Sequence, residues 1–212
     1  MQAIENKAVK VSKKPKKELI LDVAERQVSA GGLKAMTIRT IADEIGGASS
    51  SMYYHFKDLD ELVLRVNSRT ISVLDGRLAR AAAEADGMGV AILFEKLALA
   101  YLHFAIDHPM QFAALFEHRM TGDAPIPEWH LEEHYALFRH VEKPLACLQL
   151  EMADEERRVL ARTIYSAVHG IVHLAMQGRL IALPVPVIEQ QLRVITHVLA
   201  DGLAGMPGKR AA

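Results

Sequence analysis

The sequence predicts an all-α fold in two parts, in which three short, closely connected helices precede about six longer ones. Apolar side chains recur at spacings of three and four residues along most of the chain. No run alternates with the period of two that a half-buried strand shows. Glycine pairs and prolines divide the pattern into segments of helical length. Half of the residues are apolar, which is enough to build a buried core.

The composition excludes several classes of protein. A chain of 212 residues accommodates one or two compact domains. Its single cysteine, Cys147, excludes an intramolecular disulfide framework and a cysteine-based zinc module, and it suits a reducing cytoplasm. No uninterrupted apolar run reaches the roughly 18–20 residues of a membrane span, and no apolar segment follows the N-terminal lysines as a secretory signal requires. We therefore expect a cytoplasmic protein without a membrane segment.

Charge is distributed unevenly along the chain. The formal net charge is −1, yet residues 1–57 carry ten basic and six acidic side chains, whereas the rest of the chain carries 15 basic and 20 acidic ones. A basic N-terminal part on an acidic body predicts that this part alone contacts a polyanion. The alternative is a solvated lysine-rich tail without a specific partner, because such tails are common at chain ends.

The N-terminal part begins with a polar, lysine-rich arm over residues 1–15, which we expect to be disordered. The first helix is predicted over 16–30, and Gly31-Gly32 ends it. Its apolar face is expected to contain Ile20, Val23, Ala24 and Val28.

A second helix is predicted to start near Thr37, a residue type that caps helix N-termini, and to end at Gly46-Gly47. A third, short helix is expected over 49–56. Because Ala42 is small and lies four residues before the glycines, the two helices can approach closely at a steep angle. This arrangement is that of a helix-turn-helix, whose second helix presents its first residues to the major groove of DNA. An ordinary corner between two helices is the alternative.

The longer helices follow without an internal repeat. Residues 121–127 are a predicted loop. The helix after this loop, over 127–151, is expected to kink near Pro144. The chain from Gly205 is expected to fray. The predicted helices span 58–85, 90–106, a segment that starts at His108-Pro109, 127–151, 154–177 and 187–203.

The stretch TIRTIADEIGGASSSMYYHF, residues 37–56, resembles the DNA-binding signature of the tetracycline-repressor (TetR) family of transcriptional regulators. The strong similarity covers residues 16–66. The positions that match the family pattern without a gap are Thr37, Ile41-Ala42, Gly46, Tyr53, His55 and Phe56.

The resemblance implies a homodimeric DNA-binding regulator, usually a repressor, that binds a palindromic operator in double-stranded DNA and is released by a small inducer. It places a helix-turn-helix DNA-binding domain at 16–60, after the basic arm of 1–15, and a ligand-binding and dimerisation domain at 61–205. The positions where family members often reach bases are here Arg39, Ser49, Ser50 and Tyr54. Those that hold the phosphate backbone are Thr37, Ser51, Tyr53 and His55, with Lys57 just beyond them.

Three residues depart from the family pattern. Gly47 replaces an apolar residue of the turn and is expected to loosen it. Ala48 stands where a serine often caps the recognition helix, so Ser49 or Ser50 would cap it instead. Leu59 replaces a common lysine, which removes one expected phosphate contact.

The body is expected to contain the inducer pocket and the dimer interface. Segments 107–116 and 167–172 resemble C-terminal patterns of the family. The last two helices have apolar faces wider than one monomer core needs, so the resemblance implies that they pair with their copies in a dimer; packing within one monomer is the alternative. For the pocket, an apolar or aromatic ligand is expected, and the candidate lining residues, each of which could equally be core, are Phe94, Tyr101, Phe104, Phe112, Phe116, Trp129, Phe138, Tyr165 and His169.

Two other functions remain open from the sequence. His130 and His134 stand four residues apart, a spacing that can bind zinc from one helix face, so a metal-responsive helical regulator is the first alternative. An all-α enzyme with an incidental helix-turn-helix is the second. Glycine-rich phosphate loops, the Gly-x-Ser-x-Gly elbow and the His-Glu-x-x-His zinc motif are all missing from the sequence, so we expect no catalytic residue, no resident metal and no cofactor.

Overall fold

The computed structural model describes residues 14–148, 150, 152–178 and 183–206, and within these it is helical, without a β-strand. The predicted all-α fold is therefore confirmed. The predicted arm lies, apart from its last two residues, outside the described part. The helices are α1 (Lys16–Gly31), α2 (Ile38–Ile45), α3 (Leu59–Glu84), α4 (Val90–Asp107), α5 (Pro109–Glu117), α6 (Glu128–Leu137), α7 (Arg139–Cys147), α8 (Asp154–Gln177) and α9 (Val185–Ala204), with 3-10 helices η1 (Leu33–Ala35), η2 (Ser49–Tyr54) and η3 (Thr121–Asp123).

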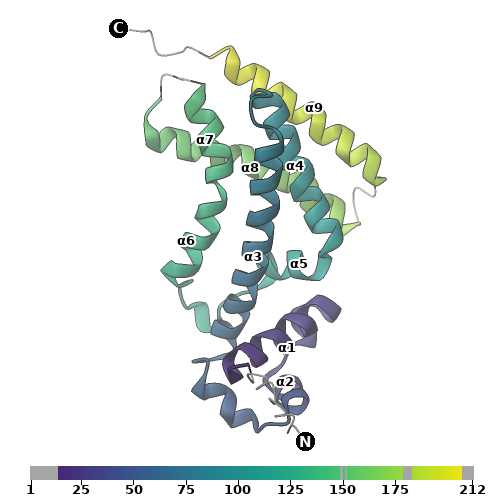
Figure 1. Ribbon diagram of the computed structural model, residues 1–212, viewed down its shortest axis with the longest axis vertical. Coiled ribbons are helices and arrows are strands. Elements are labelled where there is room, and N and C mark those ends of the chain that lie inside the picture. Colours follow the sequence, from purple (N-terminus) through teal and green to yellow (C-terminus); the bar gives the residue numbers. More distant parts are fainter. Residues whose placement is uncertain (1–13, 149, 151, 179–182, 207–212) are drawn as a thin grey trace, which may run out of the picture.

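The molecule is elongated, with α1, α2 and η2 at one end and the layer of α8 and α9 at the other (Figure 1). The long helix α3 runs between them. Its first turns join the N-terminal core, where Leu62 and Val66 pack with Met52, Phe56 and the predicted face of α1. Its later turns pack against α4 in the body. One continuous helix therefore belongs to both parts.

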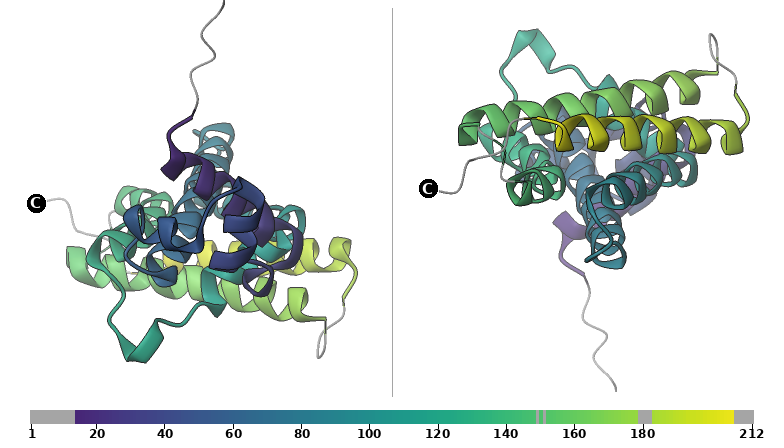
Figure 2. Two further views of the ribbon diagram at one scale, coloured as in Figure 1. Left: turned by 90° about the horizontal axis from the view of Figure 1, so that it is seen from below. Right: turned by 90° about the horizontal axis from the view of Figure 1, so that it is seen from above.

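The body is built around α4, which packs along α3 on one side and α9 on another. Leu102, Val172 and Leu192 from α4, α8 and α9 are completely buried in its largest apolar cluster. The view from above shows α8 and α9 lying side by side as an outer layer (Figure 2). The core of the body is thereby formed between helices from sequence-distant segments.

Polar contacts fix the N-terminal part against α3. Arg69 binds Glu18, Asp22 and Glu25 of α1 at 2.6, 2.9 and 2.9 Å. The buried amide of Asn67 donates to the carbonyl of Ala114 in α5 at 3.1 Å. These contacts tie α1 and α5 to the same helix, α3.

Two elements differ from the sequence-based expectation. The expected third helix is the 3-10 helix η2. It starts after Ala48 without a side-chain cap, so the cap expected from Ser49 or Ser50 is not formed. The expected helix over 127–151 is two helices, and the break lies at Phe138 rather than at Pro144, which is inside α7. The carboxylate of Asp75 on α3 binds both Arg139 and His140 just after the break. This long-range contact positions the start of α7.

Candidate nucleic-acid interface and ligand pocket

The start of α2 is fixed by a reciprocal cap, as the sequence predicts for Thr37. The Thr40 amide donates to Oγ1 of Thr37 at 3.1 Å, and the Thr37 amide donates to Oγ1 of Thr40 at 3.0 Å. The Thr40 hydroxyl contacts Gln27 of α1 at 2.8 Å. These bonds orient α2 against α1, but they also engage the Thr37 hydroxyl that was expected to contact phosphate.

The turn after α2 is a left-handed glycine turn. Gly46 has φ 66° and ψ 35°, a conformation that is strained for residues with a side chain. The amides of Gly46 and Gly47 both donate to the carbonyl of Ala42. Gly47 itself has no positive φ, so its backbone is one that other residues can adopt. The turn therefore depends on Gly46.

The short helix η2 is anchored from one side only. Met52 within it and Phe56 just after it are buried in the N-terminal core. The opposite side leaves Tyr54 89% exposed and Tyr53 58% exposed, and Ser49 and Ser50 are exposed as well. Two aromatic side chains in solvent on a rigidly anchored segment indicate an interaction surface.

The other predicted DNA-contact residues lie around this surface and differ in how exposed they are and in whether they already bind another residue. Arg39 is exposed and pairs with exposed Asp43 at 3.9 Å, an ion pair that costs little to break. Lys57 is exposed. Its contact with the Glu61 carboxylate, at 2.8 Å, is made by the backbone amide and not by the side-chain ammonium group. His55 and Ser51 are half-buried. Leu59, where a lysine was expected, is partly exposed.

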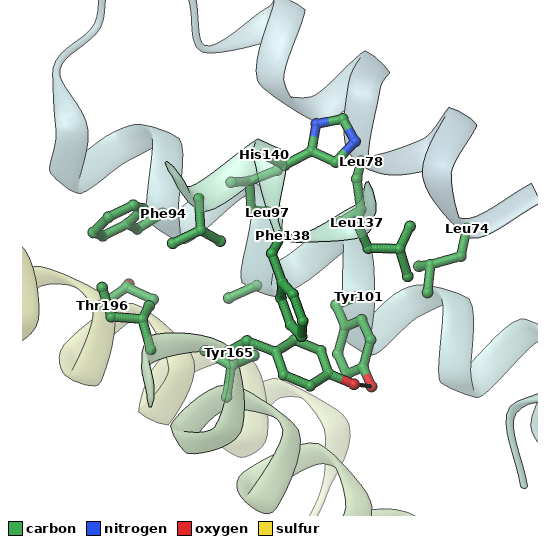
Figure 3. A pocket seen from close by; sticks show the side chains of 14 residues that line it. Leu74, Leu78, Phe94, Leu97, Tyr101, Leu137, Phe138, His140, Tyr165 and Thr196 are labelled. Carbon is green, nitrogen blue, oxygen red and sulfur yellow. Dashed lines mark hydrogen bonds between the residues drawn. The ribbon is translucent and has the colours of Figure 1, made fainter. Parts of the chain in front are cut away.

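The body contains a small apolar cavity of about 50 Å³ (Figure 3). Its walls come from α3, α4, the α6–α7 break, α8 and α9. Four predicted ligand residues line it, namely Phe94, Tyr101, Phe138 and Tyr165. The sequence reasoning missed the other lining residues, Leu74, Leu78, Leu97, Ala98, Leu137, His140, Val141, Ile164, Val168 and Thr196.

The remaining five predicted ligand residues lie outside this cavity. Phe104 is buried beside His108, and Trp129 stacks on the Arg65 guanidinium at 3.9 Å. Phe112, Phe116 and His169 form an aromatic cluster next to Tyr101. His169 is not a wall of the cavity, but its Nδ1 lies 2.8 Å from the Tyr101 hydroxyl, so it contacts the cavity lining from behind.

A clamp on α3 holds the wall formed by the α6–α7 break. Asp75 contacts Arg139 at 2.6 Å and the Nε2 of His140 at 2.8 Å. Burial alone would raise the pKa of Asp75, but the hydrogen bonds from His140 and Arg139 outweigh it and hold the pKa below its ordinary value. The carboxylate therefore stays ionised and keeps α7 on α3 at neutral pH.

The histidine pair considered for metal lies at the contact between α3 and α6. The Nε2 atoms of His130 and His134 are 3.2 Å apart, and burial lowers the pKa of His130 to about 4, with repulsion from His134 adding to the effect. Within the described ranges, no group of three or more His, Cys, Asp or Glu side chains is arranged to hold a metal ion. The metal-responsive alternative therefore gains no support from a ligand set.

Comparison with known proteins identifies the family. Residues 20–66 match the family described as bacterial regulatory proteins, tetR family, and residues 94–199 match the tetracyclin repressor-like C-terminal domain. The chain is 30% identical to the uncharacterised HTH-type transcriptional regulator Rv0681 of Mycobacterium tuberculosis over 177 residues, which cover 81% of this chain and 77% of that protein. The chain belongs to the TetR family of transcriptional regulators.

Further relatives agree with this TetR-family assignment. The HTH-type transcriptional repressor KstR2 of Mycolicibacterium smegmatis is 37% identical over 62 residues, 29% of this chain and 30% of that protein. A Rhodococcus protein of unknown function has the same fold, with a TM-score of 0.72 at 23% identity over 93% of this chain and all of that one. A TetR variant of Acinetobacter baumannii in complex with minocycline aligns with a TM-score of 0.62 at 14% identity, over 89% of this chain and 96% of that one.

The assignment confirms the predicted fold and function class. This TetR-family protein is a DNA-binding transcriptional regulator, and ligand binding and dimerisation are typical of its family. Regulators of this kind are not normally enzymes.

Proposed function

We propose that the protein binds a palindromic operator as a homodimer, represses transcription there, and is released by a small, largely apolar ligand. The proposed units are the arm of residues 1–15, a DNA-binding domain over 16–60 and a ligand-binding and dimerisation domain over 61–205. The observation that carries the proposal is the anchored helix η2, with two aromatic side chains in solvent, on a body with a separate apolar cavity. We place its action in the cytoplasm, away from membranes.

At the DNA, Ser49, Ser50, Tyr54 and Arg39 would contact base edges, since they extend from the exposed side of η2 and from the first turn of α2. Tyr53, His55 and Lys57 would hold phosphates. Thr37 and Ser51, the remaining predicted phosphate contacts, are less available in the free protein, because one caps α2 and the other is half-buried.

The dimer interface would be the outer face of α8 and α9. A groove of about 610 Å³ runs over this face, and Val194, Leu174 and Ile171 are among its apolar walls. Ala167 and Gly170 are small enough to let a second helix approach closely. Helix α8 is long and apolar enough to cross a membrane by length and composition alone. Only 22% of its most apolar 18-residue stretch is buried within the monomer. A partner subunit would cover this exposed apolar surface.

The ligand would enter the cavity by displacing its wall. A free volume of about 50 Å³ is well below the roughly 300–1,000 Å³ of ligand pockets, so binding requires the pocket to widen. Phe138 lies at the break between α6 and α7, so a ligand would displace it by loosening the contacts of Arg139 and His140 with Asp75.

Movement of α6 can reach the DNA-binding end through a short series of contacts. Trp129 of α6 stacks on Arg65 of α3 at 3.9 Å, and Arg65 pairs with Glu61 at 3.7 Å. The carboxylate of Glu61 accepts the amide of Lys57, next to η2, at 2.8 Å. A ligand that favours one position of α6 would therefore favour one separation of the two η2 segments.

The proposal is tested by selecting bound sequences from a random DNA pool with the purified protein across a salt series. The expected result is one palindrome whose half-sites lie about one helical turn apart, with affinity that falls steeply as salt rises. Enrichment by wild type but not by Tyr54→Ala would place recognition on η2. Weak, sequence-independent binding at all salt concentrations would contradict the proposal.

A further inference from the structure

Within the described residues, the cavity offers a ligand few polar groups. Thr196 is already engaged, because its hydroxyl donates to the Leu192 carbonyl at 2.7 Å. His140 binds Asp75 at 2.8 Å, and its ring lies at the far edge of the cavity from the tyrosines (Figure 3). The surface exposed to the cavity is almost entirely carbon. The Thr196 oxygen can still accept a hydrogen bond, but it lies across the cavity from the tyrosine hydroxyls (Figure 3), so a polar atom of a ligand at their edge would meet Tyr101 or Tyr165.

These two tyrosines belong to a relay with His169. The hydroxyl oxygens of Tyr101 and Tyr165 are 3.1 Å apart at one edge of the cavity (Figure 3), and the Tyr101 oxygen lies 2.8 Å from Nδ1 of His169. Burial raises the pKa of both tyrosines, so the phenols stay protonated. Burial is the main cause that lowers the pKa of His169, and repulsion from His173 adds to it, so the imidazole of His169 is neutral at pH 7.

The direction of the hydrogen bonds follows from the acidity of the partners. A phenol, with an ordinary pKa of about 10, is the best donor in this group, and a neutral imidazole nitrogen is the best acceptor. Tyr101 therefore donates its only proton to Nδ1 of His169. The contact between the two tyrosines must then be made by the proton of Tyr165, which leaves the Tyr165 oxygen with lone pairs only.

We propose that the Tyr101–Tyr165–His169 relay makes the pocket select an apolar ligand that carries a hydrogen-bond donor, such as an alcohol, over the matching ketone. Tyr165 determines specificity by presenting an acceptor, and Tyr101 and His169 position its proton. A ketone oxygen would face lone pairs in an apolar site and stay unpaired. This inference rests on the proposed function, since it requires the cavity to be the ligand site.

The test compares cyclohexanol, cyclohexanone and methylcyclohexane as size-matched probes, with calorimetry and ligand-dependent thermal stabilisation as readouts. In wild type, cyclohexanol is expected to bind about tenfold more tightly than cyclohexanone. Tyr165→Phe removes the acceptor proposed to face the ligand and leaves only the Tyr101 oxygen, 3.1 Å from it in wild type, so this ratio is expected to fall. Tyr101→Phe frees the proton of Tyr165, which can then be donated to the ketone as well as to the alcohol, so the preference is expected to disappear. Tyr135→Phe, which removes an exposed hydroxyl outside the cavity, should keep the wild-type ratio.

Each outcome bears on a definite part of the argument. Equal or tighter binding of the ketone by wild type overturns the relay, as does an unchanged ratio in Tyr101→Phe. If that variant does not fold, His169→Leu removes the acceptor of the Tyr101 proton and should weaken the preference for alcohol. Binding of methylcyclohexane without any discrimination would contradict the relay and leave the pocket intact. Failure of all three probes to bind would contradict the pocket and the relay together.

Discussion

The DNA-binding end buries the apolar faces of α1, α3 and η2 against each other and leaves Tyr53 and Tyr54 in solvent. The body has the opposite arrangement, because its candidate ligand residues, such as Tyr101 and Phe94, are buried and face an incompletely filled interior. At the first end, the candidate binding residues are those that do not pack. In the body, they are residues that pack imperfectly. Exposure locates the first kind of site, and only three-dimensional packing locates the second.

A pair of leucine substitutions tests this comparison with the largest expected effect. Leu62→Ala empties space in the closed N-terminal core and is expected to lower the free energy of unfolding by about 2–5 kcal/mol. Leu97→Ala removes a cavity wall that lacks neighbours on one side, so its cost should be smaller, about 1–2 kcal/mol. Urea unfolding of both variants measures the difference. Equal losses would show that the body packs as tightly as the DNA-binding end.

Breaking the dimer face should impair DNA binding without unfolding the chain. Val194→Glu places a charge in the exposed groove of α8 and α9 and is expected to give monomers whose operator affinity is reduced at least about 100-fold, because two half-sites no longer bind together. Val73 is equally exposed, on α3, and lies outside the lining of that groove. Val73→Glu is therefore the matched control. Sedimentation would refute the interface if both variants remained dimers.

Removing one exposed ring of η2 should have a smaller effect. Tyr54→Ala is expected to weaken operator binding about 10-fold to 100-fold while leaving the unfolding free energy nearly unchanged, since Tyr54 is 89% exposed in the free protein. Tyr135→Ala, an exposed tyrosine on α6, serves as the control. Fluorescence anisotropy with a labelled operator compares them. Loss of affinity in the control alone would move the interface away from η2.

The buried histidine of α6 should make stability depend on pH. The pKa of His130 is lowered to about 4 in the folded protein, against about 6.5 in an unfolded chain. The folded protein binds this proton less readily than the unfolded chain does. The stability that depends on a neutral His130 is therefore fully present above pH 6.5 and is lost as the pH falls from 6.5 toward 4. We expect the unfolding free energy to drop by roughly 2 kcal/mol between pH 7 and 5, and His130→Phe to reduce that drop. An equal drop in the variant would exclude this histidine as the cause.

Local signals explain what the sequence could predict. The cap at Thr37 and the turn at Gly46 depend on residues close in sequence, and both are found as expected. The helix break at Phe138 was missed because Asp75, more than sixty residues away, holds the start of α7. Leu97 was missed as a cavity wall because its spacing is that of any core residue. No signal in a single sequence separates a leucine that lines a cavity from one that is packed on all sides.

The most direct test of a two-fold DNA regulator is the stoichiometry and half-site dependence of binding to the selected duplex. Analytical ultracentrifugation should give two protomers on each duplex, and scrambling one half-site should lower affinity about 100-fold or more. Two protomers bound to the intact site and little binding to the half-site would support a dimer that reads both halves with η2. One protomer bound with the same affinity to intact and half-scrambled duplexes would contradict it.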